Sequence, residues 1–127
     1  MRYLNQEEFE LASRFLFLSM AILVIRQDIN QFKRGVFKIK EPYLELLEEM
    51  EQIATTERRA LRQRMQRMQL QVVTSTKNDS FTSFLFICKG REEERNYFNP
   101  AIRKKVEIIL KELMKKALSH IELPSAT

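Results

Sequence analysis

An apolar run lies in the middle of the first helical pattern and limits what this chain can fold into. It extends from Phe15 to Ile25 and reads FLFLSMAILVI. On a helix, the apolar side chains in and around this run fall on two sides, and a helix that is apolar on both sides must be covered on both sides. We therefore expect either the central helix of the domain or a helix shared between the core and a homodimer interface. The residues expected at that interface are Leu18, Ile22 and Ile25.

The same run is relevant to two further questions: whether the chain crosses a membrane and whether it carries a signal peptide. It has 11 residues, whereas a helix that crosses a bilayer needs about 20. Glutamates precede it at positions 7, 8 and 10, where a signal peptide would carry cations. We expect a cytoplasmic protein with no membrane insertion, and the single cysteine agrees with a reducing compartment.

Local signals mark the boundaries of the first elements. Asn5 followed by Glu8 has the spacing of a helix cap, and Gly35 after two cations is typical of a helix end. The alternation in Val36–Lys40 predicts a short, half-buried strand. Pro42 then stands where proline is tolerated, in the first turn of the next helix.

Apolar residues recur every three or four positions from Tyr43 to Val72, with a gap at Glu57. The pattern leaves two alternatives for residues 42–72: one helix, or two helices that meet near Thr55 and Thr56. A carboxylate at a helix start or a salt bridge accounts for Glu57 more simply than catalysis does.

The second half of the chain predicts a β-hairpin and a helix. Leu70–Thr76 and Phe81–Lys89 are rich in β-branched and apolar residues, and turn-forming residues separate them. Arg91–Arg95 reads as a charged connector, and Asn99 with Pro100 begins the last helix. With 44% hydrophobic residues in 127, the chain can bury one core. We expect a single domain over 1–127, of mainly helical α+β class.

The charge changes sign within the 42–72 pattern. Five glutamates and no cation occupy positions 41–56, whereas five arginines and one glutamate occupy 57–71. If a helix begins near Thr56, the order of helix, strand, helix pair and hairpin resembles that of winged-helix DNA-binding domains. This resemblance covers roughly residues 10–90 and rests on element order alone. It implies that the basic helix enters the major groove and that the hairpin lies beside it as a wing.

On this interpretation, arginine and glutamine side chains contact base edges or phosphates. The residues expected to bind nucleic acid are Arg58, Arg59, Arg62, Gln63, Gln66, Arg67 and Lys77. Two alternatives use the same charges differently. One continuous helix with acids first and cations last complements its own dipole, and two such helices could pair antiparallel in a dimer.

Few residues suit catalysis or metal binding. Cys88 stands in an apolar strand pattern, which favours a buried, inert thiol, and His120 has no partner ligands in the sequence. We therefore expect no enzyme activity, no catalytic residue, no metal and no cofactor. The sequence favours a DNA-binding regulator whose partner is double-stranded DNA; the alternative is a helical homodimeric scaffold or adaptor that binds another protein.

Overall fold

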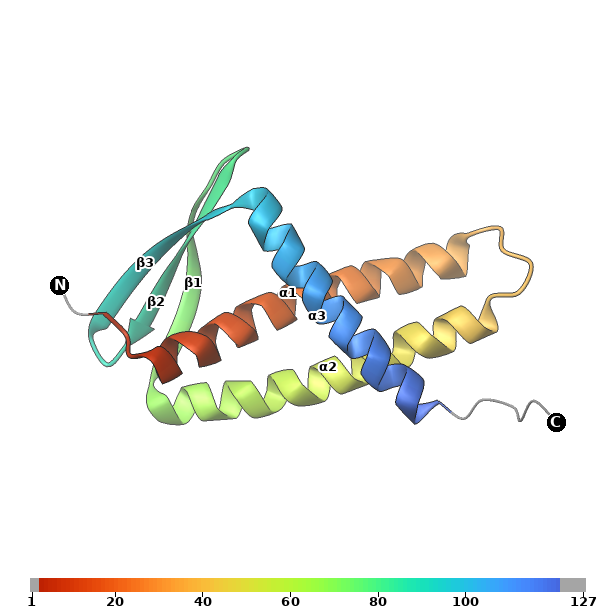
Figure 1. Cartoon of the computed structure of the whole chain (residues 1–127), viewed down its shortest axis with the longest axis horizontal. Helices are drawn as coiled ribbons and strands as arrows, with labels where there is room; N and C mark the ends of the chain where they lie inside the picture. The colour runs from red at the N-terminus through yellow and green to blue at the C-terminus, as the bar shows by residue number, and fades with distance from the viewer. Residues whose placement is uncertain (1–2, 122–127) are drawn as a thin grey trace.

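The computed structural model describes residues 3–121, which form three helices and one three-stranded sheet (Figure 1). In chain order the elements are α1 (Gln6–Arg34), α2 (Glu41–Met68), β1 (Leu70–Lys77), β2 (Phe81–Cys88), β3 (Arg91–Phe98) and α3 (Asn99–His120). The prediction of a mainly helical α+β fold is confirmed.

Helices α1 and α2 form a long hairpin, which α3 crosses (Figure 1). The start of α1 is the predicted cap: Asn5 accepts a hydrogen bond from the backbone of Glu8, and the Glu8 carboxylate accepts one from the backbone of Asn5. Helix α1 contacts both other helices and strands β1 and β2. It is therefore the central helix that its two-sided apolar pattern predicts.

Helix α2 is continuous, so of the two alternatives for residues 42–72 the single helix is correct and the break near Thr55, which the winged-helix interpretation required, is absent. The Thr55 hydroxyl donates to the backbone carbonyl of Glu51, one turn earlier, at 2.9 Å, and so it does not cap a new helix. Pro42 lies in the first turn as expected. Because the winged-helix arrangement needs two helices here, the continuous α2 removes its structural basis.

The sheet is an antiparallel meander in the order β1-β2-β3. Strands β1 and β2 form the predicted hairpin. Strand β3, however, replaces the charged connector expected over Arg91–Arg95. Its alternate residues Arg91 and Glu93 point to the core side, where Arg91 pairs with Glu8 and Glu93 accepts a hydrogen bond from the backbone of Leu4. Partners distant in sequence therefore hold a strand whose composition does not favour one.

The short strand expected over Val36–Lys40 is also absent; these residues form the loop that joins α1 to α2. Val36 is fully exposed and Ile39 is 62% exposed, so the alternation does not correspond to a buried face. Gly35 does end α1, though with an ordinary φ of −70°. Its lack of a side chain leaves room for the ring of Phe37, which a Cβ would meet at 2.4 Å.

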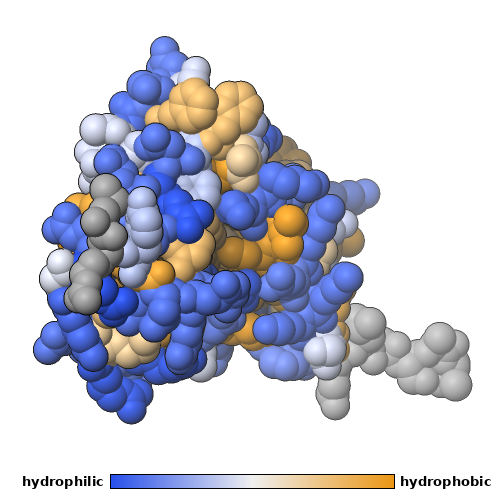
Figure 2. Space-filling model, turned by 60° about the vertical axis from the view of Figure 1, so that its left-hand side comes forward, coloured by the Kyte–Doolittle hydropathy of each residue, from blue (hydrophilic) through white to orange (hydrophobic). Residues whose placement is uncertain are grey.

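Two core clusters stabilise the fold. One lies between the three helices and includes Leu18, Ile25 and Leu113; the other lies under the sheet and includes Phe84, Phe86 and Cys88. The view of the sheet end shows a largely hydrophilic surface with separate apolar patches (Figure 2). No helix within residues 3–121 is long and apolar enough to span a bilayer.

Candidate functional site

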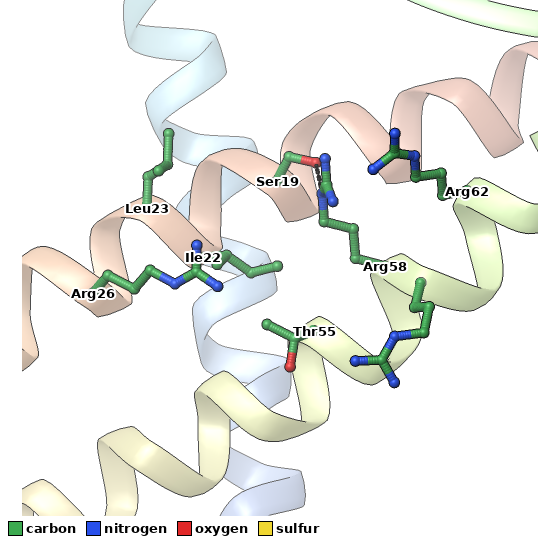
Figure 3. Close-up of a pocket in the computed structure, with 8 residues that line it drawn as sticks. Ser19, Ile22, Leu23, Arg26, Thr55, Arg58 and Arg62 are labelled. Atoms are coloured by element: carbon green, nitrogen blue, oxygen red, sulfur yellow. Dashed lines mark hydrogen bonds between the residues drawn. The ribbon is translucent and has the colours of Figure 1, made fainter.

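A hollow of about 430 Å³ opens between α1 and α2 and has four arginines in its lining (Figure 3). Both helices contribute to it, because their antiparallel packing brings the second half of α1 opposite the middle of α2. We call it the arginine hollow. Its lining residues are Ser19, Ile22, Leu23, Arg26, Thr55, Arg58, Arg59 and Arg62.

Arg58 is held in place within the hollow. Its Nε donates to the Ser19 hydroxyl at 2.8 Å, and that hydroxyl donates to the backbone carbonyl of Phe15 at 2.7 Å (Figure 3). The guanidinium carbon lies 4.7 Å from the centre of the Phe15 ring, a cation–π contact. These contacts use one N–H of Arg58, so the terminal N–H groups stay available to an acceptor.

Pairing with carboxylates separates the arginines of this region into two groups. Arg14, Arg26 and Arg64 form ion pairs with Glu57, Glu51 and Glu7, respectively. Among the described residues, no carboxylate lies within ion-pair distance of the other three, and all three line the hollow. They are Arg58, Arg59 and Arg62. Three of the four arginines that line the hollow therefore carry positive charge that no carboxylate of residues 3–121 neutralises.

The other residues predicted to bind nucleic acid divide between two places. Gln63, Gln66 and Arg67 line a shallow hollow about one turn further along α2. Lys77 lies at the far end of β1 and lines a separate hollow with Thr74 and Arg103. Six of the seven residues thus follow one stretch of α2, and Lys77 is not part of that surface.

The residues predicted for the dimer interface are in the core of the single chain. Leu18 and Ile25 are fully buried and Ile22 is 3% exposed, because the other helices pack over them. They offer no surface to a second copy, so a homodimer would use other residues. Their burial accounts for the apolar pattern that motivated the interface hypothesis.

Sequence reasoning missed the α1 side of the hollow. Ser19 is the one polar residue within the apolar run, and Arg26 follows it by seven positions, two helical turns. That spacing places both on one face of α1 and is the signal that could have identified them. Only the pairing with α2 shows that this face lies opposite Arg58 and Arg62.

Cys88 lies outside this site and is buried, as its apolar strand predicts. Burial raises the pKa of its thiol, and the hydrogen bond to the Glu8 carboxylate, at 3.3 Å, acts in the same direction. The thiol is therefore held in its protonated form.

Comparisons with known proteins match almost the whole chain. The model of the family described as "YhjD protein" matches residues 3–118. A Bacillus subtilis (strain 168) protein named "Uncharacterized protein YhjD" is 32% identical over 107 residues, which cover 84% of this chain and 89% of that protein. Its printed name states no activity, ligand or partner. No solved structure matches.

Proposed function

The chain belongs to the YhjD family, and we propose that it is a non-enzymatic binding protein that takes a phosphate-bearing ligand in the arginine hollow. The observation that carries the proposal is that Arg58, Arg59 and Arg62 line one hollow and that, among residues 3–121, none of them pairs with a carboxylate. Guanidinium groups bind phosphate oxygens through paired N–H donors, which gives both strength and orientation.

Two features distinguish this hollow from an ordinary charged helix face. Arginines that serve solubility point apart into solvent, whereas Arg58 and Arg62 both extend from α2 toward α1, across the space between the two helices (Figure 3). The Arg58 guanidinium is also oriented before any ligand arrives, by Ser19 and Phe15. A prearranged donor loses less conformational entropy on binding, which favours affinity.

Double-stranded DNA is the polymeric form of such a ligand. Gln63, Gln66 and Arg67 extend the surface beyond the hollow, so successive phosphates of one strand could be contacted along α2. Because α2 is one continuous helix, this fold lacks the separate helix that a winged-helix domain places in the major groove. The form of DNA binding that we propose to test is therefore contact with the backbone, and a regulatory role would depend on it.

The first experiment measures binding of a soluble phosphate probe and of a DNA duplex. Isothermal titration calorimetry with inorganic triphosphate, at low salt, is expected to show saturable binding. The variant Arg59→Glu/Arg62→Glu is expected to lose at least about tenfold in affinity. The control variant Lys111→Glu/Lys115→Glu makes the same change in charge on the exposed face of α3 and is expected to keep the wild-type affinity within about twofold.

A labelled duplex titrated in parallel separates the two ligand sources. Displacement of bound duplex by triphosphate would place both in the hollow, whereas triphosphate binding without duplex binding would restrict the site to small phosphates. Equal losses in the two charge variants, or no triphosphate binding, would contradict the proposal. Sedimentation velocity on the same samples tests the alternative, a homodimeric scaffold or adaptor for another protein.

A further inference from the structure

The loop between α1 and α2 exposes apolar side chains at the extremity of the helical hairpin. Val36 is fully exposed, and Phe37, Ile39 and Tyr43 are each about half exposed or more. Soluble proteins seldom gather exposed apolar residues at a protruding loop without a partner. We call this segment, residues 33–43, the hairpin tip.

Cations surround the apolar side chains of the tip. They are Lys33, Arg34, Lys38 and Lys40. Within the described part of the chain, none of the four forms an ion pair with a carboxylate, and Glu41 is the only acidic residue in the tip. Lys40 instead donates to the backbone carbonyl of Lys33 at 2.9 Å, across the base of the loop. The tip therefore combines exposed apolar groups with an excess of unneutralised positive charge.

The tip is ordered by stacked rings. The Phe32 ring lies 4.7 Å from that of Phe37 and 5.7 Å from that of Tyr43, both in stacked geometry. Gly35 permits the approach of the Phe37 ring to the backbone. With these rings packed on one another, Val36 and Ile39 are left without cover, so the exposure is built into the loop.

The tip lies at an extremity of the molecule, where a flat surface can approach it. It lies at the opposite end of the hairpin from the sheet (Figure 1), and a helix as long as the 29 residues of α1 extends about 43 Å. Among the elements formed by residues 3–121, only this loop lies beyond the ends of α1 and α2, so none of them stands between the tip and an approaching flat surface (Figure 1). The acidic residues of α2 after Glu41 lie progressively further up the hairpin, where screening by salt weakens their repulsion from an anionic surface.

From these observations we propose that the hairpin tip docks on an anionic lipid surface. Val36 and Ile39 enter the interfacial layer, and the four cations contact the headgroups. This mode of binding needs no spanning helix, so it goes beyond the expectation of no membrane insertion, which rested on the length of the apolar run. It does not depend on the proposed function, since the arginine hollow lies elsewhere on the hairpin.

Cosedimentation of the full chain with vesicles tests the proposal. Binding is expected to vesicles containing about one third phosphatidylglycerol and not to pure phosphatidylcholine. Lys38→Gln/Lys40→Gln is expected to weaken binding about 25-fold, because each cation near an anionic surface contributes about fivefold. The matched control Lys111→Gln/Lys115→Gln removes two charges from α3 and is expected to change affinity less than about twofold.

A second variant and its matched control test the apolar contribution to vesicle binding. Val36→Asp/Ile39→Asp is expected to abolish binding at near-physiological salt, whereas Val73→Asp/Ile108→Asp introduces the same charges at exposed positions of β1 and α3. The latter is expected to bind as the wild type does, provided that circular dichroism shows both variants folded. The sequence has no tryptophan, so Ile39→Trp supplies a single tryptophan, whose emission should shift to the blue on anionic vesicles.

Three results would overturn the proposal. They are an absence of binding to anionic vesicles at low salt, equal losses in the tip and control variants, and an unshifted Ile39→Trp emission on vesicles that sediment the protein. Self-association that Val36→Asp/Ile39→Asp abolishes, without vesicle binding, would assign the tip to a second copy of the chain instead. Failure of triphosphate binding would leave this inference unaffected.

Discussion

Arg14 of α1 donates two hydrogen bonds to the Glu57 carboxylate of α2, from Nε at 2.7 Å and from Nη2 at 3.0 Å. Arg14 also reaches Glu112 of α3 at 3.0 Å, so one guanidinium joins all three helices. This pairing explains why the apolar pattern of α2 is interrupted at Glu57: the position faces a cation. The salt bridge offered as an explanation for Glu57 is confirmed.

We expect Glu57→Gln to lower the free energy of unfolding by about 1–2 kcal/mol, because one charged hydrogen-bond partner of Arg14 is lost. A double-mutant cycle with Arg14→Met, measured by urea denaturation, isolates the pair. The Arg14 guanidinium also holds the pKa of Glu57 below its usual value. A coupling energy indistinguishable from zero would show that the pair does not stabilise the folded protein.

The ion pair between the buried Glu8 and the partly exposed Arg91 predicts a pH dependence of stability. The hydrogen bond from Arg91, at 2.5 Å, lowers the pKa of Glu8 from 4.5 to about 2. Because the folded-state pKa is the lower one, the stabilisation is present above about pH 4.5 and is lost as pH falls toward 2. Glu8→Gln should therefore cost about 2 kcal/mol at pH 7.

Denaturation of both proteins across this pH range checks the expectation. The difference in unfolding free energy between wild type and Glu8→Gln should narrow as the pH falls from 4.5 toward 2, where the wild-type carboxyl begins to be protonated in the folded state. A difference that stays constant between pH 7 and pH 2 would mean that Glu8 acts through packing and not through its charge.

Substitution of Leu18 tests whether the apolar run of α1 lies in the core. Leu18→Ala is expected to lower the free energy of unfolding by about 3 kcal/mol, because the side chain is fully buried between helices. The same substitution at Leu23, which is 59% exposed on the same helix, should change it by less than about 0.5 kcal/mol. Similar losses at the two positions would contradict the core described here.

Ser19→Ala tests how the arginine hollow works. Loss of the hydroxyl frees the Arg58 guanidinium, so affinity for triphosphate is expected to fall about threefold to tenfold while the melting temperature changes little. Titration calorimetry alongside thermal denaturation separates these effects. An unchanged affinity would mean that the orientation of Arg58 does not matter for binding.

The β2–β3 turn predicts a stabilising substitution. Lys89 and Gly90 both have positive φ, 51° and 81°, as a two-residue type I′ hairpin turn requires. Asparagine adopts this region more readily than lysine does, so Lys89→Asn should raise the free energy of unfolding by about 0.5 kcal/mol. Gly90→Ala should lower it by about 1 kcal/mol. Thermal denaturation measures both, and a destabilised Lys89→Asn would argue against this turn type.

Elements with strong local signals were predictable. The capping pair at Asn5 and Glu8, Gly35 after α1, Pro42 in the first turn of α2 and Pro100 in that of α3 all mark helix ends in the structure. Each signal acts through the backbone within a few residues, so it survives whatever the rest of the chain does. Helix α3 begins at Asn99 itself, whose side chain bonds to the turn before β2 instead of capping the helix.

Elements that depend on distant partners were predicted wrongly. Strand β3 exists because β2 offers an edge and because Glu8, 83 positions away, pairs with Arg91. Val36–Lys40 has the alternation of a strand but no partner strand within the described residues, so its apolar side chains stay exposed. Periodicity reports which face would be buried and cannot report whether anything covers it.

The sequence alone determined most helix ends, the β1–β2 hairpin, the class of the fold and the stretch of α2 in which arginines gather, since periodicity, capping and composition are local properties. Only the tertiary structure decided that α2 is continuous, that Leu18 and Ile25 belong to the core of one chain, and that the arginines face Ser19 across a hollow. Those outcomes depend on which helix faces cover one another. That choice is made by packing between segments far apart in the chain, where burial and ion pairing outweigh local preference.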